Sequence, residues 1–186
     1  MKLFFKHMVC IRCKMIVKAE LDSMGLHYYS VELGEAIIEE NLTPNQWDQL
    51  DTALRKSGIE LLESKKSILI EKIKNIIIEQ VHYVEEPLPT NLSTLLSELL
   101  CHDYTYLANL FSVSQGITIE KFYILHRVER IKELLIYDEL NITEIARLMH
   151  YSSVAHMSNQ FKKLTGLTPS FFKNLKNPHR ISLEDI

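Results

Sequence analysis

An internal repeat in the carboxyl-terminal half constrains the fold more than any other feature, because similar residues recur there at a fixed offset of fifty positions. In each copy, a residue able to cap a helix opens a short apolar helix, a few polar residues follow, and a second helix ends at a Gly-x-Thr sequence. Two helices joined by a turn, used twice, predict two helix-turn-helix units. The paired positions are Leu92 with Ile142, Ser93 with Thr143, Leu95 with Ile145, Leu99 with Met149, Asn109 with Asn159, Phe111 with Phe161, Gly116 with Gly166, Thr118 with Thr168, and Phe122 with Phe172.

Charge is distributed unevenly around this repeat, although the whole chain carries a formal net charge of only −3. From residue 141 to residue 180, Glu144 is the only acidic residue, whereas residues 98–140 are acidic on balance. If the chain binds a polyanion, we expect the last forty residues to make most of the contacts. The cations of this basic segment are Arg147, Lys162, Lys163, Lys173, Lys176 and Arg180.

Residues 92–176 carry motifs whose spacing resembles that of the DNA-binding domain of the AraC/XylS family of bacterial transcription regulators. The resemblance implies two helix-turn-helix units joined by a long helix, which place two recognition helices in successive major grooves of double-stranded DNA. It also implies a separate sensing or dimerising domain. The matching residues are Ile145-Ala146, Ser158, Phe161-Lys162-Lys163, Gly166 and Thr168-Pro169.

Polar side chains on the second helix of each copy are the candidate DNA contacts. Asn and Gln can each bond adenine through two hydrogen bonds, and Ser can contact phosphate or base. Lys162 and Lys163 suit phosphate contact, and they are equally compatible with solvated surface charges. The groove-facing set of the second copy is Ser152, Ser153, Ala155, His156, Asn159 and Gln160, and that of the first copy is Asp103, Thr105, Tyr106 and Asn109.

The sequence departs from the family pattern at several of these positions. The family usually has arginine where Asn109 and Asn159 stand, so the strongest guanine-reading or phosphate-pairing side chains are absent. His150-Tyr151 replaces the usual Gly-Phe of the second turn, and we expect the left-handed conformation to strain or reshape the turn at His150. The first copy is expected to contribute little beyond positioning.

Residues 2–63 alternate between strand-like and helix-like segments. Thr43 can cap the second helix, and Pro44 suits its first position. In the first helix, four residues fall near one face: Met15, Ile16, Ala19 and Met24. The pattern predicts a ferredoxin-like βαββαβ sheet with both helices on one face. Strands are predicted at residues 2–10, 26–33, 35–41 and 59–63, and helices at residues 13–25 and 42–58.

The sequence Met8-x-Cys10-x-x-Cys13 lies at the end of the first predicted strand, and with the βαββαβ pattern it resembles the heavy-metal-associated domain. That resemblance implies a loop where two cysteines bind a soft ion such as Cu(I), with the methionine turned inward. Thiolates are soft ligands, and we expect the helix start and nearby cations to lower the thiol pKa. Zn(II) would need His7, a second chain or water.

Three interpretations of the two cysteines stay open: metal binding, a reversible dithiol/disulfide pair, or a structural relic. The third cysteine, Cys101, lies in an apolar run and is expected to be buried. A long amphipathic helix is predicted from residue 64 to residue 86. We therefore expect an α+β chain with a heavy-metal-associated-like domain (1–63), a linking helix that serves as a possible dimerisation element (64–88), a DNA-binding domain (89–176) and a flexible tail (177–186).

The function predicted from these features is sequence-specific DNA binding in transcription regulation, with a possible response to a soft metal or to redox state at Cys10 and Cys13. The alternative is a metal-handling or protein-interaction adaptor whose degenerate helix-turn-helix does not read DNA. An enzyme is not expected, because no nucleophile-base-acid arrangement or phosphate-binding glycine loop can be placed. Without an apolar run long enough for a membrane span or a signal peptide, we expect a cytoplasmic protein, and the long apolar helix face suggests a homodimer.

Overall fold

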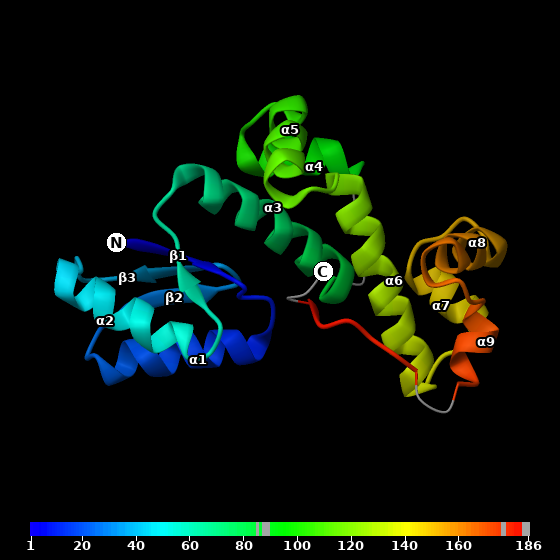
Figure 1. The fold of residues 1–186 in the computed structure, drawn as a ribbon, viewed down its shortest axis with the longest axis horizontal. Helices are drawn as coiled ribbons and strands as arrows, with labels where there is room; N and C mark the ends of the chain where they lie inside the picture. The colour runs from blue at the N-terminus through cyan, green and yellow to red at the C-terminus, as the bar shows by residue number, and fades with distance from the viewer. Residues whose placement is uncertain (85, 87–89, 176–177, 184–186) are drawn as a thin grey trace. The chain divides into compact units, whose positions relative to one another are not determined.

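The computed structural model describes residues 1–186 except 85, 87–89, 176–177 and 184–186 (Figure 1). It divides into two compact units, which are described separately: residues 1–76 with 96–103, and residues 77–95 with 104–186. The predicted domain boundaries at 88–89 and 176–177 lie outside the described residues. Across the described part of the chain, no helix combines the length and apolar character that a bilayer crossing requires.

The first unit contains a small four-stranded sheet in which the strands follow the order β2-β3-β1-β4. Strand β1 pairs antiparallel with β3 and β4, and β2 pairs antiparallel with β3. In β1, Leu3 and Phe5 are buried on the face that packs against the two helices. The elements are β1 (Lys2–Lys6), α1 (Ile11–Ser23), β2 (Tyr28–Glu32), β3 (Glu35–Ile38), α2 (Pro44–Arg55) and β4 (Glu60–Leu61).

Helices α1 and α2 contact each other and cover one face of this sheet (Figure 1). The predicted start of α2 is confirmed, since the Thr43 hydroxyl accepts a hydrogen bond from Gln46 N and Pro44 occupies the first turn. The predicted apolar face of α1 is only partly correct: Ile16 and Met24 pack against the core, whereas Met15 and Ala19 are exposed. The fully buried residues of α1 are Val17 and Leu21, whereas Met15 is 64% exposed, because the helix turns the next register toward the sheet.

Helix α3 (Lys65–His82) is the predicted long helix, and it ends four residues earlier than expected. Its residues 65–76 belong to the first unit, in which Asn75 lies beside Gly34 of the β2–β3 turn. The Lys72 ammonium lies 4.9 Å from the centre of the Phe4 ring and 3.9 Å from Glu35 Oε2. Because Phe4 alternates with the buried Leu3 and Phe5, this part of α3 covers the opposite face of β1.

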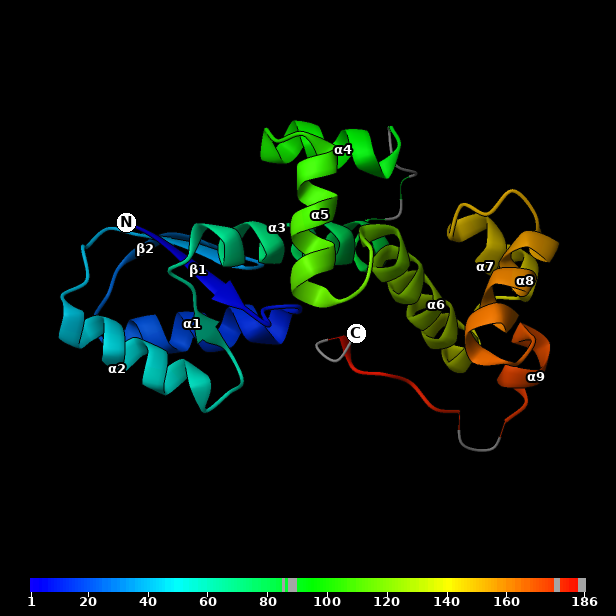
Figure 2. The ribbon, with the colours of Figure 1, turned by 45° about the horizontal axis from the view of Figure 1, so that its top comes forward.

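The remaining helices form the carboxyl-terminal region. Within the second unit, α6 contacts α5, α7, α8 and α9. Figures 1 and 2 show α5 near the beginning of α6 and helices α7 to α9 near its end. The helices are α4 (Leu92–Leu100), α5 (Tyr104–Gln115), α6 (Ile119–Tyr137), α7 (Ile142–Leu148), α8 (Val154–Thr165) and α9 (Pro169–Lys173).

The structure gives the sequence repeat a matching pattern of caps. Gly116 and Gly166 adopt left-handed conformations with φ of 71° and 77°, and they follow the ends of α5 and α8. Thr118 and Thr168 then cap the next helices through hydrogen bonds from backbone N–H groups. Asn141 caps α7 in a capping box with Glu144, while Asn91 Oδ1 accepts a hydrogen bond from Thr94 N at the start of α4.

Each copy has one left-handed residue in the turn between its two helices. The offset between these two residues differs by one position from the fifty of the repeat. In the first copy the left-handed residue is Cys101, and in the second it is His150, both with φ of 53°. The left-handed conformation expected at His150 is therefore present. Cys101, expected to be buried, is exposed because α4 ends at Leu100 and places it in the turn.

Candidate nucleic-acid interface

Helix α8 presents one buried and one exposed face, as the sequence predicts for the second recognition helix. Met157 and Phe161 are fully buried, and the Phe161 ring packs at 5.5 Å from the Phe172 ring of α9. Both residues therefore belong to the core of the second unit. The helix begins at Ser153, whose hydroxyl accepts a hydrogen bond from His156 N at 3.1 Å. Burial of these rings fixes the exposed face of α8 relative to α6 and α9.

The turn before α8 is closed by backbone hydrogen bonds typical of a left-handed helix end. His150 N donates to Arg147 O, and Tyr151 N donates to Ala146 O at 2.9 Å. The left-handed residue is histidine rather than glycine, so the turn carries a small strain. The ring of Tyr151 is buried, and the contacts of this side chain hold the turn in place.

The Tyr151 side chain contacts both α6 and α8. Its hydroxyl donates a hydrogen bond to Gln160 Oε1, and the Arg127 guanidinium lies 3.9 Å from its ring centre. The same guanidinium donates from Nη2 to the carbonyl of Met149. Burial raises the pKa of the Tyr151 hydroxyl, so it stays protonated and able to donate at neutral pH.

The predicted contacts of the second copy lie in different local environments. His156 and Asn159 are exposed on α8, and the His156 Nδ1 atom lies 3.1 Å from Ser152 Oγ. The Ser153 oxygen accepts the capping hydrogen bond, which leaves its O–H able to donate. Gln160 is half-buried, and its oxygen is occupied by Tyr151, so the two-bond contact with adenine expected for it is not available in this conformation.

The second copy also carries several cations on or near the exposed face of α8. Lys162 and Lys163 are exposed in the last turn of α8, and within the described part of the chain neither forms an ion pair. Lys173, in contrast, pairs with Asp138. Arg147 is exposed and lines a shallow groove together with Ser152 and other residues of the α7–α8 turn. Arg147 was absent from the predicted contacts, although the charge count had already included it in the basic segment.

The first copy offers a different surface. Thr105, Tyr106 and Asn109 are exposed on α5, whose buried face consists of Leu107 and Phe111. The sequence of α5, YTYLANLFSVSQ, contains no lysine or arginine. Asp103, which precedes it, is exposed. The three predicted side chains therefore share one exposed face, and this face carries no cation for phosphate contact.

The two cysteines of the amino-terminal motif lie where β1 passes into α1. The Cys10 and Cys13 Sγ atoms are 3.4 Å apart, and Cys10 is the residue before the first turn of α1. Burial raises the pKa of the Cys13 thiol, and its hydrogen bond with Cys10 raises it further. The expected lowering is therefore wrong for Cys13. Lys14, one of the expected cations, instead pairs with Glu32 at 2.6 Å.

The additional metal ligands considered from the sequence are not assembled around this pair. Met8 is fully buried in the core of the first unit, as the resemblance implied for an inward-turned methionine. The His7 carbonyl accepts a long hydrogen bond from Cys13 Sγ, at 3.8 Å. Among the side chains that the structure describes, no three His, Cys, Asp or Glu residues form a group able to hold a metal ion.

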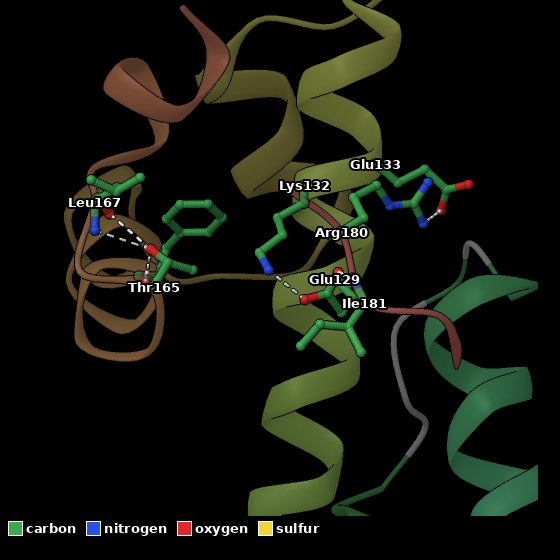
Figure 3. Close-up of polar contacts among 8 residues, drawn as sticks. Glu129, Lys132, Glu133, Thr165, Leu167, Arg180 and Ile181 are labelled. Atoms are coloured by element: carbon green, nitrogen blue, oxygen red, sulfur yellow. Dashed lines mark hydrogen bonds and ion pairs between the residues drawn. The ribbon is translucent and has the colours of Figure 1, made fainter. Parts of the chain in front are cut away.

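The segment after α9 contacts α6, although a flexible tail was predicted from residue 177. Ile181 N donates to Glu129 Oε2 at 3.1 Å, and Arg180 Nη2 lies 3.7 Å from Glu133 Oε2 (Figure 3). Glu129 is buried and also pairs with Lys132 at 2.5 Å. Arg180 and Ile181 therefore lie against α6, the helix that joins the two helix-turn-helix units.

Comparisons with known proteins agree with this geometry. A family model described as a helix-turn-helix domain matches residues 96–174. The chain is 27% identical to a solved structure, the C-terminal domain of AraT, a response regulator from Geobacillus stearothermophilus. That superposition has a TM-score of 0.51 and covers 64% of this chain and 92% of the other.

Two curated relatives carry names of transcriptional regulators. The chain is 19% identical over 155 residues to the uncharacterized HTH-type transcriptional regulator YtdP of Bacillus subtilis (strain 168), covering 82% of this chain and 20% of the relative. It is 25% identical over 121 residues to the probable transcriptional regulator LumQ of Photobacterium leiognathi, covering 64% of this chain and 47% of the relative. The chain thus spans a fifth to about half the length of these relatives.

These matches share a helix-turn-helix region with proteins that are named as transcriptional regulators. The family model extends over both copies of the repeat, from the second half of α4 to the end of α9. The matched range contains the capping threonines and the buried phenylalanines that occur at equivalent positions in the two copies. Residues 96–174 of this chain therefore match a helix-turn-helix domain in sequence and in structure.

Proposed function

We propose that this chain binds double-stranded DNA sequence-specifically and regulates transcription in the manner of the AraC/XylS family. The observation that carries the proposal is the exposed face of α8, where Lys162, Lys163 and Asn159 are held by a buried aromatic anchor. A helix of this kind fits a major groove. The Asn159 amide can contact base edges there, and the ammonium groups of Lys162 and Lys163 can contact phosphates.

The two copies are proposed to contribute unequally. Helices α7 and α8 supply three exposed cations, Arg147, Lys162 and Lys163, whereas α5 supplies none. Phosphate contacts provide most of the salt-dependent affinity for DNA. We therefore assign anchoring to the second copy, and we assign to Thr105, Tyr106 and Asn109 of the first copy a role in positioning or base contact.

The test is binding of the purified full chain to mixed genomic DNA fragments across a range of salt concentrations. Phosphate contact predicts that the logarithm of affinity falls linearly with the logarithm of salt concentration, with a slope near −0.9 per phosphate neutralised. Sequencing of the fragments retained at high salt then identifies the preferred site. A flat salt dependence would favour the alternative, an adaptor whose helix-turn-helix does not read DNA.

We also propose that the first unit is a ferredoxin-like domain of the heavy-metal-associated kind. The strand order β2-β3-β1-β4, the placement of Cys10 and Cys13 between β1 and α1, and the inward Met8 support this assignment. Two sulfur atoms 3.4 Å apart, with no third side-chain ligand among the described residues, fit a soft ion of low coordination number such as Cu(I) better than Zn(II).

Under this proposal, metal or redox state at the two thiols changes DNA binding. The experiment compares the wild type with a Cys10→Ser/Cys13→Ser variant, each with and without Cu(I), and measures DNA affinity in all four states. Competition with a chromophoric Cu(I) chelator reports metal binding independently of DNA. An oxidised sample, analysed by mass spectrometry for a Cys10–Cys13 disulfide, tests the redox alternative. Equal DNA affinity in every state would reject a sensing role.

The proposal extends to where the chain acts, what it binds and how it assembles. A transcription regulator acts where DNA is, so we assign the chain to the bacterial cytoplasm, with double-stranded DNA as its partner. We propose a homodimer, since regulators with two-fold symmetric sites commonly bind DNA as dimers. Sedimentation of the full chain over a range of protein concentrations tests this assignment, and a monomer at every concentration would exclude it.

A further inference from the structure

A small cavity lies within the second unit, between the end of α3, the middle of α6 and the end of α7. Its volume is about 80 Å³, room for two or three groups the size of a water molecule. Tyr123, Arg127 and Arg130 of α6 form one wall. Met149 and His150, at the turn of the second helix-turn-helix, form another. None of the described residues that line it is acidic.

The charges around this cavity do not balance. Arg130 and Arg180 share one carboxylate, that of Glu133, at 2.8 and 3.7 Å. Glu129, the other acidic residue of this part of α6, is occupied by Lys132. No carboxylate among the described residues pairs with Arg127.

Arg127 is the arginine of this cavity whose charge no described carboxylate balances. Its guanidinium has five N–H donors, of which one bonds the Met149 carbonyl. It lies between two aromatic rings, 3.9 Å from the centre of Tyr151 and 5.5 Å from that of Tyr123. Aromatic faces attract a cation but do not neutralise it. The group is therefore fixed in orientation while its charge stays available to an anion.

We propose that this cavity binds a small oxyanion, a short carboxylate or an inorganic phosphate, with Arg127 as its counter-charge. A planar guanidinium presents parallel N–H donors that match two oxygens of such an anion. The limited volume excludes a nucleotide or a long-chain acid. His82 and the tyrosine hydroxyls on the cavity wall supply neutral hydrogen-bonding groups beside the charge.

The position of the cavity gives the anion a regulatory role that rests on the proposed DNA binding. It adjoins Met149 and the left-handed His150, whose turn precedes α8. An anion drawing on Arg127 competes with its bond to the Met149 carbonyl and so changes the support of that turn. Binding of the anion and binding of DNA are measured separately, so failure of one is distinguishable from failure of the other.

The first measurement needs no variant. The isotopically labelled full chain is titrated with sodium phosphate and with sodium propionate, at constant ionic strength maintained with sodium chloride, and backbone amide shifts are followed by NMR. Propionamide, which has the same shape as propionate without the charge, is the control ligand. We expect saturable shifts centred on Tyr123, Met149 and His150 with at least one of the two anions. Shifts centred on Lys162 and Lys163, or no saturable shift, would overturn the proposal.

Variants then test the counter-charge. Arg127→Gln is expected to weaken anion binding by about tenfold or more, the loss expected for one charge-assisted contact. Arg127→Lys keeps the charge and should retain most of the binding. Lys121→Gln removes an exposed charge from the same helix, outside the cavity lining, and should change affinity by less than about twofold. Equal losses in Arg127→Gln and Lys121→Gln would show a general charge effect and refute the site.

Discussion

The Arg127 guanidinium lies 3.9 Å above the Tyr151 ring, and Tyr151 in turn donates a hydrogen bond to Gln160. This pair joins α6 to the turn before α8 and to α8 itself. The orientation of the second recognition helix thus depends on an aromatic residue in its turn as well as on the buried Phe161. A change confined to the Tyr151 hydroxyl isolates the polar part of this contact.

Tyr151→Phe is expected to destabilise the second unit by about 1 kcal/mol, because it removes one hydrogen bond and leaves the ring and its contact with Arg127 in place. Urea unfolding followed by far-UV circular dichroism measures the effect. Tyr137→Phe, at an exposed position on α6, is the matched control and should change stability by less than about 0.5 kcal/mol. Similar losses in the two variants would mean that the Gln160 contact contributes nothing.

Lys162→Gln and Lys163→Gln are each expected to weaken DNA binding similarly on all sequences and to reduce the magnitude of the salt slope by about 1. Both ammonium groups are exposed at the end of α8, where they can reach phosphates. Lys173→Gln is the matched control, since it removes the same charge from a lysine already paired with Asp138. Electrophoretic mobility shifts over a salt series measure the slopes. A slope that changes only in Lys173→Gln would move the phosphate contact away from α8.

The repeat and its caps were predictable from the sequence because each depends on a local rule. Gly116 and Gly166 occupy left-handed positions, and Thr118 and Thr168 cap the following helices, at the same offset in both copies. The exposure of Cys101 was not predictable in this way. An apolar run shows which residues favour burial, but a one-residue shift of the turn decides which of them faces solvent.

The exposure of the candidate site residues was predictable from the sequence, whereas their contacts were less so. Asn159, Lys162 and Lys163 lie exposed as expected, since helical periodicity determines which side of α8 they share. The bond from Tyr151 to Gln160 and the tail contact of Arg180 with Glu133 join positions whose proximity depends on tertiary packing. No spacing rule indicates them. The same holds for the cavity beside Arg127, which three separate helices form.

Gly34→Ala is expected to destabilise the first unit by about 2 kcal/mol or more. Gly34 has φ of 79°, and a Cβ atom there would lie 1.9 Å from Asn75 Nδ2 of α3. Strain in the left-handed conformation and displacement of a buried amide both oppose the substitution. The only tryptophan, Trp47, packs against the core of this unit, so its fluorescence during urea unfolding reports the loss. Gly25→Ala, at another left-handed glycine where an added Cβ meets no atom within 4 Å, separates conformational strain from steric overlap.

Acidification is expected to destabilise the second unit through His82. Burial, together with the nearby charges of Arg130 and Arg180, lowers the pKa of this imidazole from 6.5 to about 4. Its other neighbour is the buried His126, whose Nδ1 lies 3.3 Å from His82 Nε2. Since the folded pKa lies below the unfolded one, the unfolded chain binds more protons between pH 4 and pH 6.5, and stability falls as pH decreases through that interval.

Between pH 7 and pH 5 the His82 contribution amounts to at most about 2 kcal/mol. Urea unfolding of the wild type and of His82→Gln, followed by far-UV circular dichroism at both pH values, isolates it from the titration of other groups. The variant should lose less stability than the wild type on acidification, because glutamine forms hydrogen bonds without taking up a proton. Equal losses in the two proteins would show that His82 is protonated as readily in the folded unit as in the unfolded chain, and that its burial between α3 and α6 imposes no cost on the charged form.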